Sequence, residues 1–326
     1  MSSAPLFVLG VRRSGTTLLR LILDRSSGIA IPDESHFVPQ LAHRHGAPVD
    51  RDRFLEDLRR LRTLPRWDLS PDEVAPLVRS GMTTGEAIGA IFTAYAAKHG
   101  KPRWGDKTPA YMRHLPLLER LFPDAIFVHL MRDGRDVALS LLALGEGVVG
   151  RTGANPESAP GAALQWATEI SDARALGRRA GSPRYLEVRY EELVAEPSAV
   201  VESVCTFAGI AFDPAMLEPS EAEIAKRPHH RRLVEPPSKR RDWSTEMSAA
   251  DVQSFEAIAG PLLAELGYEL SEPAAARENR RAKVSLVWYR ARIDAWKAAA
   301  HATQRSPLWR RRHPRLSGEG GELRRE

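Results

Sequence analysis

The sequence predicts an α/β fold in which helices flank a parallel sheet, and three observations lead to this prediction. Leu6–Leu9 is a short apolar run bounded by Pro5 and Gly10, which is typical of a buried strand. The segment Thr16–Asp24 follows closely and has the apolar periodicity of a helix. Later apolar runs are separated by enough helical sequence for the crossover connections that parallel strands require.

Three further strands are expected, because each is a short apolar run between polar or helical segments. They are Ile29–Ile31, Ala125–Met131 and Tyr185–Arg189. The helix Val137–Leu144 is expected after the second of these strands, and the helix Ala249–Leu266 is expected to close the main body.

The chain of 326 residues, 43% of them hydrophobic, is long enough to bury a large core. We expect one domain over residues 1–273, with a helical insert at about 45–100 beside the ligand cleft. Residues 145–160 are rich in Gly, Pro and small side chains, which indicates a mobile loop. Residues 274–326 are expected to form a basic C-terminal helix and a disordered end.

The positive charge of the chain is concentrated in this C-terminal segment. Residues 277–326 hold 14 of the 47 Lys and Arg residues but only 5 of the 42 Asp and Glu residues, so residues 1–276 are mildly acidic. An apolar stripe at helical spacing comprises Val284, Val287, Trp288, Ala291, Ala295 and Ala298. We expect this stripe to pack on the main body, and the alternative is weak contact of the basic helix with an anionic membrane surface.

The composition argues against several classes of protein. The single cysteine, Cys205, excludes an internal disulfide framework and a cysteine-rich zinc site, and its apolar neighbours predict core packing. No constellation of metal ligands is visible, and the basic charge comes without a nucleic-acid reading motif. No apolar run is long enough for a signal sequence or a membrane span, so a cytoplasmic location is expected.

The segment from Gly10 to Thr17 has the G-x4-G spacing of a phosphate loop between a strand and a helix. Backbone N–H groups and the helix N-terminus would then face an anion. The lysine that reaches the β- and γ-phosphates in a Walker loop is absent, because Thr16 occupies its position and a cation stands three places earlier at Arg13. A nucleotide with a single phosphate on its 5′ side suits this loop, whereas a purely structural turn is the alternative for the segment taken alone.

The stretch Pro5–Gln40, in which Arg13-Ser14-Gly15-Thr16-Thr17 is followed by Pro32-Asp33-Glu34-Ser35, resembles the sulfotransferase family, nearest its bacterial and tyrosylprotein branches. The resemblance implies a nucleotide-kinase-like fold and 3′-phosphoadenosine 5′-phosphosulfate as co-substrate. It also implies that the loop binds the 5′-phosphosulfate through Arg12, Arg13, Ser14, Gly15, Thr16 and Thr17. Arg12 departs from the pattern, since many members have proline there.

A second anion site is predicted where the strand Ala125–Met131 ends at Arg132. Ligands gather at this edge of a parallel sheet, and a guanidinium can bind a phosphate through two parallel hydrogen bonds. Arg132 and Ser140 resemble the family's 3′-phosphate element, which favours a 3′,5′-bisphosphate nucleotide over ATP. The alternative is an ion-pair cluster in which Arg132, Asp133, Arg135 and Asp136 cap a helix.

Two other segments resemble parts of the family's nucleotide site. The run from Ser238 to Trp243 supplies three cations, and the resemblance implies that one or two of Lys239, Arg240 and Arg241 contact the 3′-phosphate. Tyr190, directly after a predicted strand, is similar to the family's aromatic residue near the adenine. Trp166 is a weaker candidate for that pocket, and core packing is favoured for it.

Sulfuryl transfer needs a base for the acceptor proton and positive charge where the bridging oxygen becomes negative. Glu34 resembles the base of the tyrosylprotein branch, provided that burial raises its pKa, and His36 is the rival. In Gly105-Asp106-Lys107-Thr108-Pro109, Lys107 resembles the family's second catalytic cation and is expected to flank the sulfuryl group together with Arg13. The alternative for this pentapeptide is an ordinary helix start capped by Thr108.

The predicted function is therefore transfer of the sulfuryl group to an acceptor hydroxyl, which yields a sulfate ester and adenosine 3′,5′-bisphosphate, without a metal ion. The alternatives are a small-molecule or nucleoside kinase, which the missing loop lysine disfavours, and a non-catalytic nucleotide-binding protein. The acceptor class is left open among small molecules, glycans, lipids and protein tyrosines, because acceptor choice resides in variable loops. The sequence predicts no oligomeric state.

Overall fold

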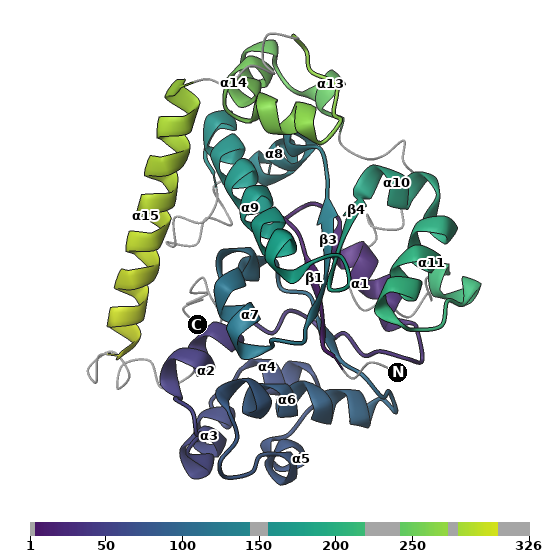
Figure 1. Cartoon of the computed structure of the whole chain (residues 1–326), viewed down its shortest axis with the longest axis vertical. Helices are drawn as coiled ribbons and strands as arrows, with labels where there is room; N and C mark the ends of the chain where they lie inside the picture. The colour runs from purple at the N-terminus through teal and green to yellow at the C-terminus, as the bar shows by residue number, and fades with distance from the viewer. Residues whose placement is uncertain (1–3, 144–155, 219–241, 273–279, 306–326) are drawn as a thin grey trace.

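A computed structural model describes residues 4–143, 156–218, 242–272 and 280–305 of the chain. At its centre lies a four-stranded sheet with the order β2-β1-β3-β4, in which every pairing is parallel (Figure 1). The strands are β1 (Leu6–Leu9), β2 (Gly105–Asp106), β3 (Ile126–Met131) and β4 (Tyr185–Arg189). Because all strands run the same way, the segments that follow them meet at one edge of the sheet.

Alternation of side chains along the strands divides the core into two layers. Leu6 and Val8 point into one layer with Val128, whereas Phe7 and Phe127 point into the other. The first layer is covered by α1 (Thr16–Asp24), α10 (Tyr190–Ala195) and α11 (Pro197–Ala208). The second layer is covered by α6 (Thr84–Lys98), α7 (Leu115–Leu121) and α9 (Ala159–Ala180). Cys205 is buried in the first layer, as its apolar neighbours predicted.

The remaining helices lie at the two ends of the sheet (Figure 1). At one end lie α2 (Val38–Arg44), which precedes the predicted insert, and, within the insert, α3 (Arg51–Leu58), α4 (Thr63–Arg66), α5 (Pro71–Val74) and the 3₁₀ turn η1 (Ala75–Leu77). At the other end lie α8 (Gly134–Leu142), α13 (Trp243–Glu246) and α14 (Ala249–Glu265). Two 3₁₀ turns, η2 (Pro109–Arg113) and η4 (Pro214–Leu217), complete the described body. The predicted domain boundaries stay a prediction.

The prediction of a strand at Ile29–Ile31 is wrong. Only Ala30 pairs in the sheet direction, through an isolated bridge with Trp104. Instead, two side chains of α1 form hydrogen bonds with the backbone of Ile31. Asp24 accepts from the N–H of Ile31 at 2.8 Å, and Arg20 donates to the carbonyl oxygen of Ile31 at 2.9 Å. Because its N–H and carbonyl groups are both used in these bonds, Ile31 does not form the backbone hydrogen bonds of a strand. The short β2 therefore forms the edge of the sheet.

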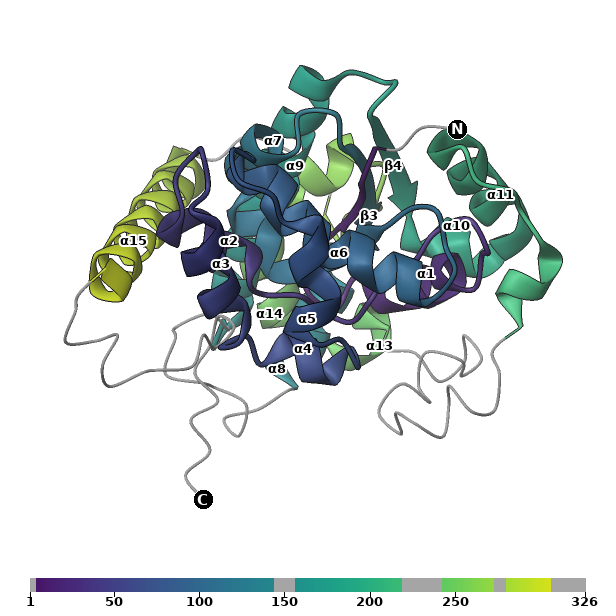
Figure 2. The ribbon, with the colours of Figure 1, turned by 90° about the horizontal axis from the view of Figure 1, so that it is seen from below.

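The C-terminal helix α15 (Arg280–Arg305) lies along α9, on the opposite side of the molecule from α11 (Figures 1 and 2). The prediction that its apolar stripe packs on the main body is wrong, because Val287 is 66% and Trp288 72% exposed. A different face is turned inward, where Leu286 packs on the core and Arg290 forms an ion pair with Asp172 at 2.6 Å. Within the described ranges, no helix has the length and apolar character needed to cross a membrane.

Candidate active site

The parallel strand order arranges the predicted site residues along one edge of the sheet. Lys107 follows β2, the loop from Gly10 follows β1, Arg132 follows β3 and Tyr190 follows β4. Since the strand order is β2-β1-β3-β4, the loop lies between Lys107 on one side and Arg132 on the other. The topology thus explains why cations that are distant in the sequence flank a single phosphate loop.

Two glycines give the loop its shape. A side chain on Gly10 would lie 2.7 Å from the carbonyl oxygen of Leu130, so only glycine permits this approach of the loop to β3. Gly15 has a φ of 89°, a left-handed conformation that L side chains rarely adopt. Arg13 also adopts a left-handed conformation, with a φ of 74°, which is unusual for a residue with a side chain and marks a constrained functional loop.

The N-terminus of α1 is prepared for an anion. Gly15 is its N-cap, no side chain caps it, and its first turn contains no acidic residue. The first amides of a helix carry a partial positive charge and need an outside partner. The hydroxyl of Ser14 is fully buried and has no hydrogen-bond partner within the described part of the chain. An anion bound on the loop would satisfy both the amides and this hydroxyl, so the residues fit the predicted 5′-phosphosulfate.

The second predicted anion site adjoins the loop directly. Arg13 Nε donates to Ser140 Oγ at 2.8 Å, and the guanidinium of Arg132 lies within 3.5 Å of the carbonyl oxygen of Arg13. The structure thus associates the side chain of Arg13 with Ser140, whereas we expected it opposite Lys107. Arg132 also donates to Asp136 at 3.1 Å. The guanidiniums of Arg13 and Arg132 are therefore held on the β3 side of the loop.

Tyr190 begins α10 and packs against the loop. A side chain on Gly15 would collide with the Tyr190 ring, and the guanidinium of Arg132 lies 4.7 Å from the centre of this ring. The aromatic ring therefore orients Arg132 through a cation–π contact. A contact of Tyr190 with the adenine stays a prediction.

In the charged string after β3, Asp133 and Arg135 have structural roles. Asp133 caps α8 by accepting from the backbone N–H of Arg135 at 2.8 Å, as the alternative interpretation of this string proposed. Arg135 is buried, where it forms ion pairs with Asp133 at 2.7 Å and with Glu256 of α14 at 2.6 Å. Trp166 is fully buried and donates its indole N–H to the carbonyl oxygen of Arg132 at 3.1 Å, so the preference for core packing is confirmed.

Glu34 and Lys107 meet on the β2 side of the loop. Lys107 Nζ lies 2.6 Å from Glu34 Oε1 and donates to Thr17 Oγ1 at 3.1 Å, which links this pair to the first turn of α1. The other oxygen of Glu34 lies 3.1 Å from His36 Nε2. The predicted base therefore contacts both its rival, His36, and the predicted cation, Lys107.

The charge states of this group follow from burial and pairing. Burial by itself raises the pKa of Glu34, but the hydrogen bond from His36 and the charge of Lys107 outweigh it, so the pKa lies well below its ordinary value. The expectation that burial would leave Glu34 with a raised pKa is therefore wrong. Burial lowers the pKa of the Lys107 ammonium, whose side chain is only 3% exposed, and Glu34 opposes this shift.

A buried hydrogen-bond network holds the two short segments that carry these groups. Ser35 Oγ donates to one carboxylate oxygen of Asp106 at 3.0 Å, and Thr108 Oγ1 donates to the other at 3.0 Å. The backbone N–H of Ser35 donates to Thr108 Oγ1 at 3.0 Å, and a bond of 2.6 Å joins Ser35 Oγ to the hydroxyl of Tyr111. Because Ser35 follows Glu34 and the other two flank Lys107, the network fixes the backbone on which both side chains stand.

Sequence reasoning missed this network. The hydroxyl of Thr108 makes no capping bond to η2, so the capping interpretation of that residue is wrong. Burial raises the pKa of Asp106 to about 6, although its hydrogen bonds from Ser35 and Thr108 oppose the shift. The signal available in the sequence was the pair of hydroxyl residues next to Glu34 and Lys107, but their partnership spans more than 70 residues and is visible only in the fold.

The remaining predictions for the site concern the cations at 239–241, Arg12 and the absence of a metal ion. Lys239, Arg240 and Arg241 lie outside the described residues, so their contact with the 3′-phosphate stays a prediction. Burial raises the pKa of Glu169 in α9, and the charge of Arg12 is among the effects that oppose this rise; a contact of Arg12 with the 5′-phosphosulfate stays a prediction. In the portion of the chain that the structure describes, no group of three or more His, Cys, Asp or Glu residues could hold a metal ion.

A lysine-less phosphate loop at the edge of a parallel sheet, flanked by a lysine and a second arginine–serine site, defines a group-transfer enzyme that uses a nucleotide. The sequence profile of the Sulfotransferase family matches residues 5–214. The chain therefore belongs to the sulfotransferase family, as the resemblance implied. The predicted sulfotransferase activity is confirmed, and it argues against the kinase and the non-catalytic alternatives.

Similar proteins support this assignment. The chain is 29% identical to the nodulation protein NoeE of Sinorhizobium fredii, over 81% of this chain and 66% of NoeE. It is 26% identical to protein-tyrosine sulfotransferase 2 of Gallus gallus, over 81% of this chain and 69% of that protein. The sulfotransferase domain of the Synechococcus olefin synthase has a TM-score of 0.53 at 26% identity, covering 79% of this chain and 96% of that domain. The predicted α/β fold class is thereby confirmed.

Proposed function

We propose that the donor nucleotide lies along the carboxyl edge of the sheet, with its 5′-phosphosulfate on the loop after β1 and its 3′-phosphate beside Arg132 and Ser140. The observation that carries this proposal is the order of groups along the edge, in which Lys107 and Arg132 stand on opposite sides of the loop. The buried hydroxyl of Ser14 supports the first placement. The hydrogen bond between Arg13 and Ser140 supports the second, because a phosphate there would meet two guanidiniums and a hydroxyl.

The segment with Lys239 and Arg240 is proposed to add charge at the 3′-phosphate. Its support is Trp243, three residues after Arg240. The backbone N–H of Trp243 donates to Asp136 at 2.9 Å, and its ring lies 3.5 Å from the guanidinium carbon of Arg135. The chain therefore enters α13 next to the beginning of α8, on the side of the loop where Arg132 is held.

The bound donor supplies an activated sulfuryl group, and the residues on the β2 side are proposed to assist its transfer. Lys107 stabilises the negative charge that develops on the donor's bridging oxygen. When Lys107 turns to these oxygens, Glu34 loses one of the partners that lower its pKa and becomes a stronger base for the acceptor proton. The hydrogen bond from His36 remains and orients the carboxylate.

Calorimetry with two nucleotides tests this function. The protein is expected to bind adenosine 3′,5′-bisphosphate at least about 100-fold more tightly than ATP. The loop lacks the lysine that binds a γ-phosphate, whereas Arg132 and Ser140 are proposed to bind a 3′-phosphate. ATP binding as tight as that of the bisphosphate would contradict the proposal. As a control, Arg179→Ala should bind both nucleotides as tightly as the wild type does, because Arg179 pairs with Glu119 on the surface, away from the loop.

A further inference from the structure

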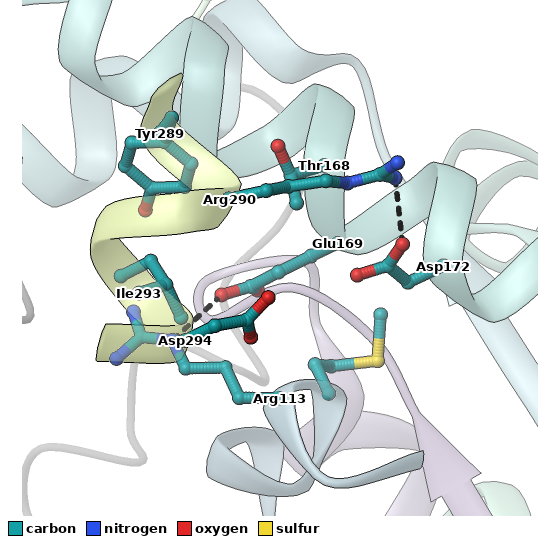
Figure 3. A pocket seen from close by; sticks show the side chains of 9 residues that line it. Arg113, Thr168, Glu169, Asp172, Tyr289, Arg290, Ile293 and Asp294 are labelled. Atoms are coloured by element: carbon teal, nitrogen blue, oxygen red, sulfur yellow. Dashed lines mark hydrogen bonds and ion pairs between the residues drawn. The ribbon is translucent and has the colours of Figure 1, made fainter. Parts of the chain in front are cut away.

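A pocket of about 200 Å³ lies between α15, α9 and the end of η2 (Figure 3). The charged and aromatic residues among those that line it are Arg113, Glu169, Asp172, Tyr289, Arg290 and Asp294. None of them belongs to the nucleotide site described above. The inward face of α15 therefore helps to form a pocket whose lining residues are distinct from those of the nucleotide site.

One of the segments that line this pocket begins close in sequence to the proposed transfer centre, which is formed by Glu34 and Lys107. Arg113 ends η2, which begins two residues after Lys107. Burial raises the pKa of Glu169 above its ordinary value, and the positive charges of Arg113 and of Arg12 in the phosphate loop oppose this rise. An acceptor that approaches the loop between these two segments would occupy the pocket.

Glu169 has a buried carboxylate oxygen that could accept a hydrogen bond from a ligand. It is only 5% exposed, and its Oε1 atom accepts from Arg113 Nε at 3.2 Å and from Gln165 Nε2 at 3.1 Å. Its Oε2 atom is buried and has no hydrogen-bond partner among the described residues. A buried carboxylate oxygen without a partner is costly, and a ligand that donates a hydrogen bond recovers this cost.

The charges around the pocket favour the same kind of ligand. Three carboxylates, from Glu169, Asp172 and Asp294, line it together with the guanidiniums of Arg113 and Arg290. Arg290 is engaged with Asp172 at 2.6 Å, and Arg113 with Glu169 (Figure 3). A ligand with a carboxylate would bring a further negative charge next to Glu169, whereas an ammonium or hydroxyl group would meet an acceptor.

We propose that this pocket binds the sulfuryl acceptor and that Glu169 Oε2 selects acceptors that carry a second hydrogen-bond donor, an ammonium or hydroxyl group, over acceptors that carry a carboxylate. The acceptor role rests on the proposed function. The preference for ligands that donate a hydrogen bond does not rest on the proposed function, because it follows from the residues that line the pocket.

Three phenols that differ only in the group at the far end test the proposal. Tyramine carries an ammonium group, 4-(2-hydroxyethyl)phenol a hydroxyl and 4-hydroxyphenylacetate a carboxylate. Each is titrated calorimetrically into the full-length protein saturated with adenosine 3′,5′-bisphosphate. Tyramine is expected to bind at least about tenfold more tightly than 4-hydroxyphenylacetate, with the neutral phenol between them, as one charge-assisted hydrogen bond provides. Equal affinities, preference for the carboxylate or no binding of any phenol would overturn the proposal.

Variants assign the preference to the pocket. Glu169→Gln should reduce the tenfold discrimination to about threefold or less, whereas Glu119→Gln, which also removes a carboxylate paired with an arginine, should leave it unchanged. Ile293→Trp fills the pocket from α15 and should abolish phenol binding but not nucleotide binding. Unaltered discrimination in Glu169→Gln would refute the role of Glu169, and unaltered phenol binding in Ile293→Trp would refute the pocket.

The same titrations separate this inference from the proposed function. Nucleotide affinity is measured first, and its absence would contradict the nucleotide site without affecting the pocket, because the phenols are then titrated into the nucleotide-free protein. Normal nucleotide affinity without the expected order of phenols would contradict the pocket alone.

Discussion

The residues at the transfer centre are balanced in pairs, Lys107 with Glu34 on one side of the loop and Arg132 with Asp136 on the other. Each pairing orients a cation and partly neutralises its charge; in the proposed function, a phosphate or sulfuryl oxygen would replace the carboxylate. Two of the three non-glycine residues with positive φ in the described chain, Arg13 and His36, lie in this small region. Such backbone strain persists only where the surrounding structure maintains it, which is typical of functional sites.

The identity of the base leads to a prediction at this scale. If Glu34 is the base, kcat/KM should stay constant as the pH falls from 8 to about 5, because the pKa of Glu34 lies below its ordinary value and the carboxylate loses its activity only when it is protonated. Glu34→Gln should lower kcat about 100-fold or more, and His36→Gln less than about threefold. The measurement is a pH–rate profile with any acceptor that the enzyme turns over. An acid limb centred near 6.5 that disappears in His36→Gln would assign the base to His36 instead.

At the scale of elements, a buried ion pair fastens the end of β3 to the rest of the body. Arg135 at the start of α8 and Glu256 of α14 are 2.6 Å apart, and each side chain is only 1% exposed. Arg135 also donates to the carbonyl oxygen of Glu269 at 2.7 Å. The pair therefore holds α8 and α14 together directly behind Arg132, so that the anion site depends on an element more than 100 residues away.

Removal of one partner should be costly. Glu256→Ala is expected to lower the free energy of unfolding by about 3–5 kcal/mol, because the buried Arg135 would lose one of its two carboxylate partners and keep only Asp133. Glu56→Ala, which removes an exposed carboxylate paired with Arg60, should change it by less than about 1 kcal/mol. Urea denaturation of both variants measures the difference. Similar losses in the two variants would show that the buried pair has no special role.

The elements that sequence reasoning predicted correctly are those with strong local signals. Leu6–Leu9, Thr16–Asp24 and Tyr185–Arg189 form with the expected bounds, because each combines apolar periodicity with a clear boundary. The two-residue strand β2 has no such pattern, and the side chains of α1 withdraw Ile31 from the sheet. The same limit applies to the site, where single motifs were visible but the network of Ser35, Asp106 and Thr108 was not.

At the scale of the whole molecule, α15 presents a surface that the packing does not explain. Val284, Val287 and Trp288 are more than half exposed on a helix that also carries Arg280 and Arg292 on its exposed surface. An exposed apolar stripe with a tryptophan and flanking arginines is typical of a helix that lies on an anionic membrane. Neither this contact nor the cytoplasmic location is tested by the structure, and both stay predictions.

Vesicle binding tests the membrane contact. Co-sedimentation should be at least about tenfold stronger with vesicles containing a third of anionic lipid than with purely zwitterionic vesicles, and it should decline with added salt. Trp288→Ser should weaken it, because the indole contributes apolar area at the interface, whereas Trp67→Phe, deep in the core, should not. Equal sedimentation with both lipid mixtures would favour a protein partner for this stripe.

The central claim is that one sheet edge binds a nucleotide by both its 5′ and its 3′ phosphate groups. The most direct measurement is a calorimetric comparison of adenosine 3′,5′-bisphosphate and adenosine 5′-monophosphate in the wild type and in Arg132→Ala. The substitution should weaken the bisphosphate about 30-fold or more, as expected for a lost charge-assisted hydrogen-bond pair of about 2 kcal/mol, and leave the monophosphate within about twofold. Equal weakening of both nucleotides, or of neither, would contradict a 3′-phosphate site at Arg132.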